Sequence, residues 1–346
     1  MQKRAVAILT GPDTYLDHLG VICYLMEIPL LITEEDTYQA ALTFYPFIQV
    51  IKKEIGELSY DFLATNFDVI FESGRFWVTE LESVLSHVYK KNMRFVYCPH
   101  GNSDKGHSFL IHMNQDISLF YGQHMLDLLT KTGAKTNIRA LVRTGNCRLQ
   151  LYKKHKEFYQ SLARTRIQSK LIQGRPTVLY APTWQDGENP SSFFSQTGRV
   201  IKDLQEEYNV LIKMHPFLEE QHPAHTYQIL GLYEQVEGVC FIQKYPAIYS
   251  LLEICDLYIG DYSSIGYDFL YFDRPLYFFA EEGNASCNTL IHTKGLVIPS
   301  GVKINQFIQE TIEENKKKNR KELYEHAFGE EKDFLELRRE LELTIF

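Results

Sequence analysis

The chain alternates short apolar runs with amphipathic stretches, and this alternation restarts once near residue 177. The runs have the length of buried strands, whereas stretches such as 78–90 have helical spacing. Strands that alternate with helices form parallel sheets with helices on both faces. The expected strands are 5–10, 30–33, 67–71, 94–98, 117–121, 177–181, 210–213, 239–242, 257–259 and 276–279. The sequence therefore predicts an α/β fold with two Rossmann-type, doubly wound halves facing a cleft.

A basic segment separates the two halves, which we place at residues 1–172 and 173–346. Residues 152–175 carry Lys and Arg side chains against a single acid, Glu157, for a local net charge of +6. Two interpretations stay open: a solvated helix between the halves, or contact with an anionic partner or a membrane surface. We expect the second half to end in charged helices that begin near residue 305.

Charge and cysteine spacing argue against several functions. The net charge of −8 disfavours a nucleic-acid partner, because phosphate backbones attract a basic excess. The six cysteines include no C-x-x-C pair, which disfavours a zinc ribbon and indicates a reducing compartment. The longest apolar stretch, 19–32, is interrupted by Glu27 and Pro29 and is too short to span a bilayer. Without an export signal in the pattern, we expect a cytoplasmic protein.

The ends of the predicted strands are the informative positions, because ligands of open α/β sheets bind outside the carboxyl ends of the strands. Neither half carries G-x-G-x-x-G after its first strand, and G-x-x-x-x-G-K-[ST] is absent, so dehydrogenase and P-loop functions lose their main support. The strand 94–98 runs into Pro99-His100-Gly101. A histidine at this rim is suited to act as a general base on a hydroxyl. The alternative for His100 is a structural role as a helix cap or turn residue.

The second half presents two similar strand ends. The strand 210–213 ends at Lys213 and is followed by Met214-His215-Pro216, where the proline biases His215 to an extended backbone. The strand 177–181 is followed by a segment that contains Thr183 and Trp184. The alternative for His215 is a structural role. The alternative for Trp184 is burial in the core.

The strongest local signal is the segment 256–270, where an apolar strand meets Asp261-Tyr262-Ser263-Ser264 and a helix begins. Ser263 or Ser264 is expected to cap this helix. A helix start with free N–H groups and two hydroxyls can receive a phosphate or pyrophosphate. The alternative is that the serines only cap.

Five ordered segments together carry a resemblance to a known family. They are PHGNSDKG (99–106), TGNCRLQLY (144–152), YAPTWQD (180–186), IKMHP (212–216) and IGDYSSIGYDFLYFDRPLYFF (259–279). In this order they resemble the CDP-glycerol glycerophosphotransferase family of wall teichoic acid synthesis. The resemblance implies a GT-B-like fold, with the acceptor on the N-terminal half and the nucleotide donor on the C-terminal half.

The resemblance also implies residue roles. His100 would be the base for the acceptor hydroxyl, and His215 would contact the donor pyrophosphate. The donor-phosphate site would comprise Lys213, Asp261, Tyr262, Ser263 and Ser264, the nucleotide site Thr183 and Asp268, and the acceptor side Gly101, Asn102 and Lys105. Family members usually continue His-Gly with a Thr-Pro-Leu-Lys-like run, and here Lys105 would keep the basic role.

The reaction implied by the resemblance is the transfer of glycerol phosphate, or a related polyol phosphate, from a CDP-linked donor to a hydroxyl, with release of CMP. The acceptor would be a polyol-phosphate or glycan-lipid, and the product a teichoic-acid-like or capsular cell-surface polymer. We expect no cofactor and no metal. Among the motif residues, Asp261 and Asp268 are the only closely spaced carboxylates that could hold Mg²⁺ beside a nucleotide. The expected location is the cytoplasm, with peripheral contact at the inner face of the membrane as a further hypothesis.

Two rival functions remain. One keeps the fold and changes the chemistry to a nucleotide-sugar glycosyltransferase or a UDP-sugar 2-epimerase. The other is a non-catalytic protein that binds a glycan or a nucleotide. Profiling of nucleotide donors separates these functions.

Overall fold

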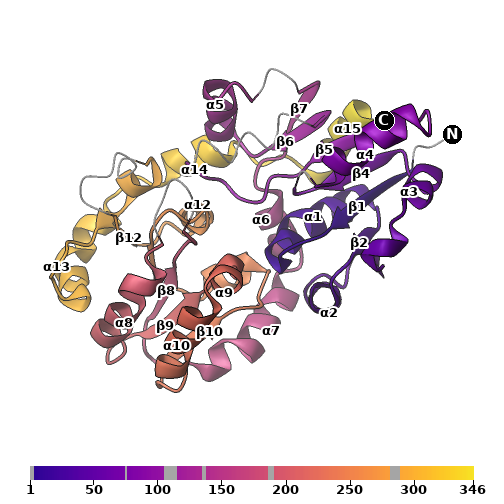
Figure 1. The fold of residues 1–346 in the computed structure, drawn as a ribbon. Coiled ribbons are helices and arrows are strands. Elements are labelled where there is room, and N and C mark those ends of the chain that lie inside the picture. The colour runs from indigo at the N-terminus through magenta and orange to yellow at the C-terminus, as the bar shows by residue number, and fades with distance from the viewer. Residues whose placement is uncertain (1–3, 75, 105–114, 135–137, 186–190, 281–288) are drawn as a thin grey trace. The chain divides into compact units, whose positions relative to one another are not determined.

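The computed structural model describes residues 4–74, 76–104, 115–134, 138–185, 191–280 and 289–346. The chain forms two compact units, each built around one parallel sheet (Figure 1). The first unit comprises Met1–Lys154, Lys244–Ala247 and His326–Phe346, and the second comprises His155–Gln243 and Ile248–Glu325. The predicted α/β fold with two doubly wound sheets is confirmed. The predicted boundary at 172/173 stays a prediction.

The first sheet has the strand order β3-β2-β1-β4-β5-β6-β7 in the described residues. All of its described pairings are parallel. Its strands are β1 (Ala5–Leu9), β2 (Leu30–Ile32), β3 (Val50–Lys52), β4 (Val69–Glu72), β5 (Arg94–Tyr97), β6 (Ile117–Phe120) and β7 (Ala140–Arg143). Because the order reverses between β1 and β4, the loops after these strands open the crevice where such sheets bind ligands.

Helices cover both faces of this sheet, as βαβ connections require. They are α1 (Leu16–Met26), α2 (Glu35–Phe44), α3 (Tyr60–Asn66), α4 (Phe76–His87), α5 (Gln123–Lys131), α6 (Cys147–Lys154) and α15 (Phe334–Ile345), with short 3₁₀ turns at Asp13–Tyr15 and Ile55–Glu57. Apolar side chains of β1, β4 and β5 pack against α3 and α4 to form a core.

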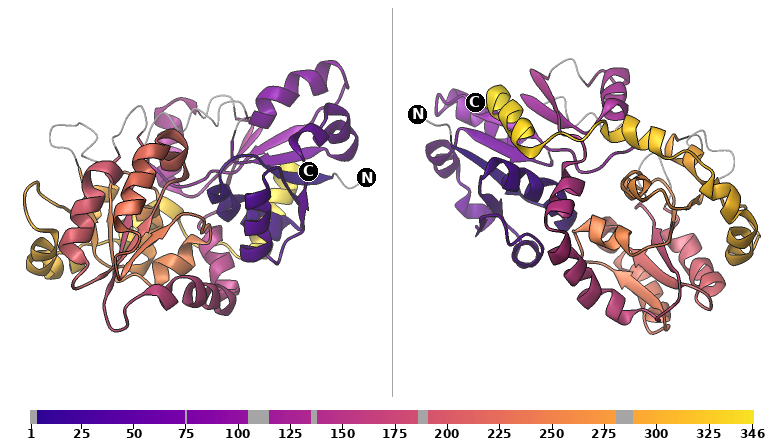
Figure 2. Two further views of the ribbon diagram at one scale, coloured as in Figure 1. Left: turned by 60° about the horizontal axis from the view of Figure 1, so that its bottom comes forward. Right: turned by 180° about the vertical axis from the view of Figure 1, so that it is seen from behind.

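The last helix, α15, packs in the first unit. Its buried residues Leu337, Leu341 and Ile345 recur every four positions and so line one face of the helix. The Arg94 guanidinium donates a hydrogen bond to the carbonyl of Ile345. The yellow α15 accordingly lies beside the purple strands of the first sheet (Figure 2).

The second sheet repeats the same winding, with the order β10-β9-β8-β11-β12-β13. Its strands are β8 (Thr177–Ala181), β9 (Asn209–Lys213), β10 (Val239–Ile242), β11 (Leu257–Gly260), β12 (Leu276–Phe278) and β13 (Leu296–Val297). Its helices are α7 (Lys156–Arg166), α8 (Phe193–Leu204), α9 (Pro216–Gln221), α10 (Pro223–Tyr233), α11 (Ile248–Glu253), α12 (Ile265–Phe269), α13 (Ile304–Lys316) and α14 (Lys321–Phe328), with 3₁₀ turns at Gln168–Lys170, Leu270–Phe272 and Ile291–Lys294. The order reverses between β8 and β11, which places the segments after Ala181 and Gly260 at the crevice.

Three strands lie outside the predicted set, and all of them are short or at an edge. β3 and β7 are the edge strands of the first sheet, and most of their side chains are only half-buried. β13 has two residues at the edge of the second sheet. Edge strands need no continuous apolar run, so the pattern that found the central strands does not mark them.

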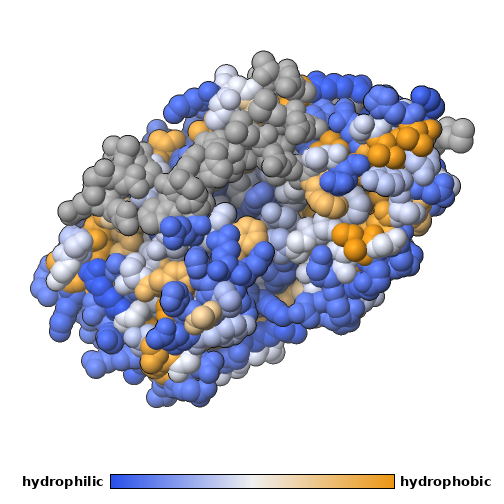
Figure 3. Space-filling view, in the orientation of Figure 1, coloured by the Kyte–Doolittle hydropathy of each residue, from blue (hydrophilic) through white to orange (hydrophobic). Residues whose placement is uncertain are grey.

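Hydrophilic side chains predominate on the face of the molecule shown in Figure 3, and the apolar ones are scattered. Exposed large apolar side chains such as Val88 and Leu232 belong to this ordinary background.

Candidate functional site

His100 follows β5, where Pro99 ends the strand and Gly101 takes a φ of 139°. Such a φ strains any residue with a side chain, so Gly101 permits the turn that presents the histidine. The Nδ1 atom of His100 lies 3.0 Å from the carbonyl oxygen of Ser73, in the loop after β4. A carbonyl only accepts, so Nδ1 carries the proton and Nε2 is the basic nitrogen.

Two tyrosines surround the His100 imidazole. The ring of Tyr15 lies 4.8 Å from the imidazole, centroid to centroid, and the Tyr97 hydroxyl is 3.3 Å from Nδ1. Desolvation by the surrounding protein lowers the pKa of His100, and the hydrogen bond to Ser73 partly opposes this effect. His100 is exposed at the strand end, and the lowered pKa favours the neutral imidazole that a general base requires.

Glu72 precedes Ser73 in the chain and is a buried carboxylate beside the His100 site. The sequence motifs did not single it out. Its buried carboxylate accepts hydrogen bonds from the backbone N–H groups of Trp77 and Val78, each at 3.1 Å, and from Gln115 Nε2 at 3.2 Å. Burial raises the pKa of Glu72 to about 7, and these hydrogen bonds oppose the rise. Because Glu72 directly follows the strand predicted at 67–71 and is the last residue of β4, the strand-end rule that selected His100 applies to it equally.

A buried chain of hydrogen bonds fixes the other side of the Pro99–His100 backbone. The Tyr121 hydroxyl donates to the Pro99 carbonyl at 2.6 Å, and His18 Nδ1 lies 2.8 Å from the same hydroxyl. Because the Tyr121 hydroxyl donates its proton to Pro99, it can only accept from His18, so Nδ1 of His18 carries a proton. Burial, then the Arg148 guanidinium and the neighbouring His100 imidazole, hold the pKa of His18 well below its usual range.

Asn102, predicted on the acceptor side, is committed to internal contacts. Its side-chain N–H donates to the Ala327 carbonyl at 2.9 Å, and its Oδ1 lies 3.0 Å from Nδ1 of His124. The side chain is buried, so in this structure it anchors the segment before α15. Lys105 lies outside the described residues.

His215 begins α9 as its N-cap residue, with Pro216 in the first turn. The backbone N–H of Phe217 donates to His215 Nδ1 at 3.2 Å. Because Nδ1 accepts, the proton of the neutral ring is on Nε2, and His215 presents a donor there. The tautomers of His100 and His215 are therefore opposite.

Lys213 lies at the end of β9, two residues before His215. Its side chain is buried, and Nζ lies 3.5 Å from the carbonyl oxygens of Met214 and Gln243. These long contacts keep a cationic group near the strand end that also presents His215.

Asp261 connects the two strand ends at the crevice of the second sheet. Its buried carboxylate accepts from the N–H groups of Thr183 at 2.8 Å, Tyr262 at 2.7 Å and Ser192 at 3.0 Å, and from the Ser192 hydroxyl at 2.7 Å. Burial raises the pKa of Asp261, and these hydrogen bonds oppose the rise. Its carbonyl accepts from His292 Nε2 at 2.8 Å. The carboxylate thus holds the loops after β8 and β11 together.

The segment after Asp261 has two half-buried serines at the start of α12. The N–H of Ile265 points to the Ser263 hydroxyl at 3.4 Å, and Ser264 is the N-cap residue without a side-chain capping bond. Asp268, one turn later, is buried and accepts from the Tyr249 hydroxyl at 2.8 Å. The serine hydroxyls are therefore better placed for a ligand than the Asp268 carboxylate.

Comparison with known proteins gives the same assignment as the five segments. Residues 128–298 match the model of the CDP-Glycerol:Poly(glycerophosphate) glycerophosphotransferase family. Over these residues, which are just under half of the chain, the sequence is similar to this family. The match includes Thr183, Lys213, His215 and the 261–264 segment, whereas His100 lies before it.

Curated relatives share only part of their length with this chain. The teichoic acid glycerol-phosphate primase of Bacillus subtilis is 28% identical over 109 residues, which cover 31% of this chain and 26% of the relative. The teichoic acid poly(glycerol phosphate) polymerase of the same organism is 30% identical over 129 residues, covering 35% of this chain and 16% of the relative. The chain thus matches a minor part of each.

A solved structure shows the same fold over nearly the whole of this chain. The wall teichoic acid polymerase TagF superposes with a TM-score of 0.68 at 14% identity, over 99% of this chain and 87% of that one. At this identity the likeness shows the fold, which is the GT-B-like arrangement that the resemblance implied.

Two kinds of feature are absent from the described residues. No helix in the described part of the chain is both long and apolar enough to cross a membrane. Among the same residues, no cluster of three or more His, Cys, Asp or Glu side chains could hold a metal ion. The cysteines at 23, 98, 147, 240 and 255 are free and buried.

Proposed function

We propose that this protein transfers glycerol phosphate, or a related polyol phosphate, from a CDP-linked donor to an acceptor hydroxyl and releases CMP. The match of residues 128–298 to the glycerophosphotransferase family carries the proposal. The opposite tautomers of His100 and His215 support it, because the reaction needs one proton acceptor and one hydrogen-bond donor. The acceptor side is assigned to the first unit and the donor side to the second.

In the proposed reaction, the acceptor oxygen attacks the phosphorus that carries the glycerol, and the bond from this phosphorus to the CMP oxygen breaks. The acceptor proton passes to Nε2 of His100, and CMP leaves with the electron pair of the broken bond. Negative charge grows on the CMP oxygens, where the Nε2–H of His215 and the Lys213 ammonium stabilise it. Positioning and charge neutralisation, rather than covalent catalysis, therefore carry this mechanism.

The donor site is proposed at the start of α12 and the loops beside it. Ser263 and Ser264 would bind the pyrophosphate through their hydroxyls and backbone N–H groups. We assign Asp261 a positioning role, because its carboxylate accepts four hydrogen bonds from Thr183, Tyr262 and Ser192. Asp268 would position α12 through Tyr249.

The acceptor is proposed to be a polyol-phosphate or glycan-lipid chain of a teichoic-acid-like or capsular polymer, made in the cytoplasm at the inner face of the membrane. The basic segment 152–175 supports surface contact, since Arg164, Arg166 and Lys170 are exposed on and after α7. Co-sedimentation with anionic and neutral vesicles tests this part, and equal binding to both would contradict it.

Donor profiling tests the main proposal. The pure protein is incubated with CDP-glycerol, CDP-ribitol, UDP-glucose and UDP-N-acetylglucosamine, with and without a glycerol-phosphate-primed lipid, and free nucleotide is measured. We expect CMP release from a CDP-linked polyol that depends on the acceptor. Release of UDP, or epimerisation of the UDP-sugar, would favour the rival enzymes, and binding without turnover of any donor would favour a binding protein.

A further inference from the structure

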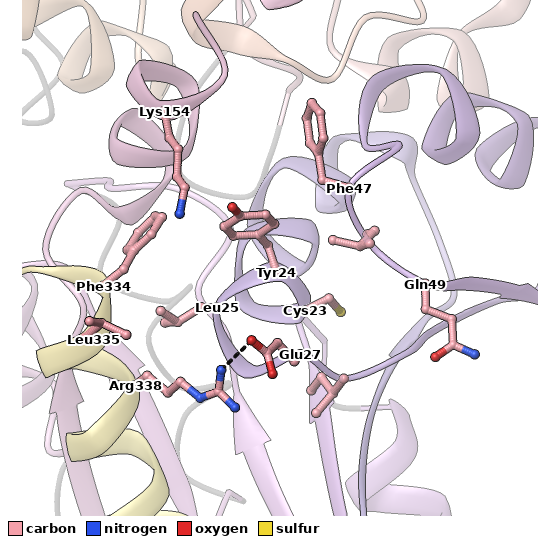
Figure 4. Close-up of a pocket in the computed structure, with 12 residues that line it drawn as sticks. Cys23, Tyr24, Leu25, Glu27, Phe47, Gln49, Lys154, Phe334, Leu335 and Arg338 are labelled. Atoms are coloured by element: carbon pink, nitrogen blue, oxygen red, sulfur yellow. Dashed lines mark ion pairs between the residues drawn. The ribbon is translucent and has the colours of Figure 1, made fainter.

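A cavity of about 420 Å³ lies in the first unit (Figure 4). Its walls come from the end of α1, the segment before β3, Lys154 at the end of α6, and the start of α15. Ile28 and Gln49 line it; Gln49 directly precedes β3, and only Pro29 separates Ile28 from β2. The cavity therefore opens at the amino edge of the sheet, whereas His100 follows the carboxyl end of β5. Its volume is in the range of small-molecule sites.

Lys154 is one of two cationic side chains that line this cavity, the other being Arg338. Its ammonium lies over two aromatic rings, 5.2 Å from the centroid of Tyr24 and 5.9 Å from that of Phe334. Figure 4 shows the side chain reaching toward the space between these rings. No carboxylate of the described residues forms an ion pair with Lys154, whereas its neighbour Lys153 is paired with Glu331 at 2.5 Å. The ammonium of Lys154 is thus available to an anion.

The opposite wall is polar and nearly neutral. Arg338 forms ion pairs with Glu27 at 2.7 Å and with Glu342 at 2.9 Å, so its charge is compensated within the protein. The Glu27–Arg338 pair lies beside the cavity and offers both acceptors and donors (Figure 4). Gln49, which is exposed, adds an amide that can do both.

The remaining wall is aromatic and aliphatic. Phe47 meets Tyr24 edge-on at 6.5 Å between centroids, and Phe334 lies 6.1 Å from Tyr24. An aromatic face packs against the C–H groups of a sugar ring, while hydroxyls at the ring edge require paired donors and acceptors. A single available cation, aromatic faces and hydroxyl-binding groups therefore occur in one cavity.

We propose that this cavity binds a phosphorylated sugar. The phosphate pairs with the Lys154 ammonium, the sugar ring packs on Tyr24 and Phe334, and its hydroxyls bond to the Glu27–Arg338 pair and Gln49. The site is separate from the proposed transfer reaction, because none of its residues belongs to the strand ends that carry His100 or His215.

Binding of glucose 1-phosphate, glucose and inorganic phosphate to the full-length protein tests the proposal, by saturation-transfer-difference NMR and calorimetry. We expect glucose 1-phosphate to bind saturably and at least about tenfold more tightly than either fragment, since both halves of the site then contribute. Lys154→Met should weaken it about tenfold or more, which is the scale of one charge-assisted hydrogen bond. Gln49→Ala, on an exposed side chain, should weaken it less.

Lys153→Met is the matched control, because it removes the adjacent charge that is already paired with Glu331. It should leave the affinity unchanged, and so should His100→Ala, whose side chain lies at the other edge of the sheet. Absence of saturable binding, equal weakening by Lys153→Met and Lys154→Met, or phosphate binding as tightly as the sugar phosphate would overturn the proposal. None of these results depends on CMP release, so failure of the proposed function would be seen separately.

Discussion

The carbonyl oxygen of Ser73 lies 3.0 Å from Nδ1 of His100 and thereby assigns the proton of the neutral imidazole to that nitrogen. The basic nitrogen is then Nε2. In the second unit, the Phe217 N–H imposes the opposite tautomer on His215. Two histidines that look alike in the sequence thus differ in which ring nitrogen carries the proton.

Replacement of His100, the proposed base, should remove the acid limb of the profile of kcat/KM against pH. A base acts when deprotonated, so kcat/KM of the wild type should rise with pH through the pKa of His100 and then level off. Because desolvation lowers this pKa, the midpoint should fall below the usual histidine value of about 6.5. His100→Ala should abolish this limb and reduce kcat by roughly 10²–10⁴-fold.

His87→Ala changes an exposed histidine of the same unit and serves as the control, with unchanged activity and profile. The profiles are measured with saturating acceptor. A pH dependence that survives in His100→Ala, or near-normal turnover of that variant, would show that His100 is structural.

His215→Ala should lower kcat about 100-fold, the scale of one lost preorganised donor to a developing charge. The acid limb of the profile should stay, because that limb belongs to His100. Steady-state kinetics of this variant and of His225→Ala, which alters an exposed histidine of the second unit, separate the roles. Equal rates in the two variants would rule out the proposed donor role.

Glu72→Gln should change how stability depends on pH. The pKa of Glu72 is raised from 4.5 to about 7, so the folded state binds the extra proton between these values and wild-type stability falls as pH rises through them. Relative to Glu72→Gln, the wild type should lose about 3 kcal/mol between pH 4 and pH 8, because each pKa unit is worth about 1.4 kcal/mol.

Denaturant unfolding of wild type and Glu72→Gln at both pH values measures this difference. Glu80→Gln, an exposed carboxyl on α4, should show no such change. A constant difference between wild type and Glu72→Gln at the two pH values would mean that Glu72 titrates normally.

Asp261→Asn should destabilise the second unit by about 2 kcal/mol. An amide keeps one oxygen but points an N–H₂ group at donors of Thr183 or Ser192, so a buried donor loses its acceptor. Chemical denaturation compares this variant with Glu237→Gln, an exposed control. Full stability together with lost donor binding would instead assign Asp261 to direct contact with the donor.

Donor affinity should depend on the second unit alone. Cytidine nucleotides should bind more tightly than uridine nucleotides by calorimetry, and Ser264→Ala should weaken CDP-glycerol binding about tenfold, as loss of a hydrogen bond to a charged group does. His100→Ala and the exposed Ser195→Ala should leave this affinity unchanged. Tighter binding of UDP would favour the rival nucleotide-sugar enzymes.

The central strands and the positions of His100 and His215 at strand ends were predictable from the sequence. A strand such as β8 is buried on both faces, and this burial requires a continuous apolar run that can be read locally. The apolar pattern does not predict edge strands such as β7, because contact with only one neighbouring strand leaves most of their side chains half-exposed.

The partners of the polar side chains were decided only by the tertiary structure. Ser73 and His100 are 27 residues apart, and Thr183 and Asp261 are 78 apart, yet each pair shares a hydrogen bond because parallel strands bring their carboxyl ends to one edge of a sheet. A sequence shows that a histidine or an aspartate follows a strand. Which nitrogen holds the proton, and whether a carboxylate faces a ligand or buried N–H groups, depends on atoms that only folding brings within 3 Å.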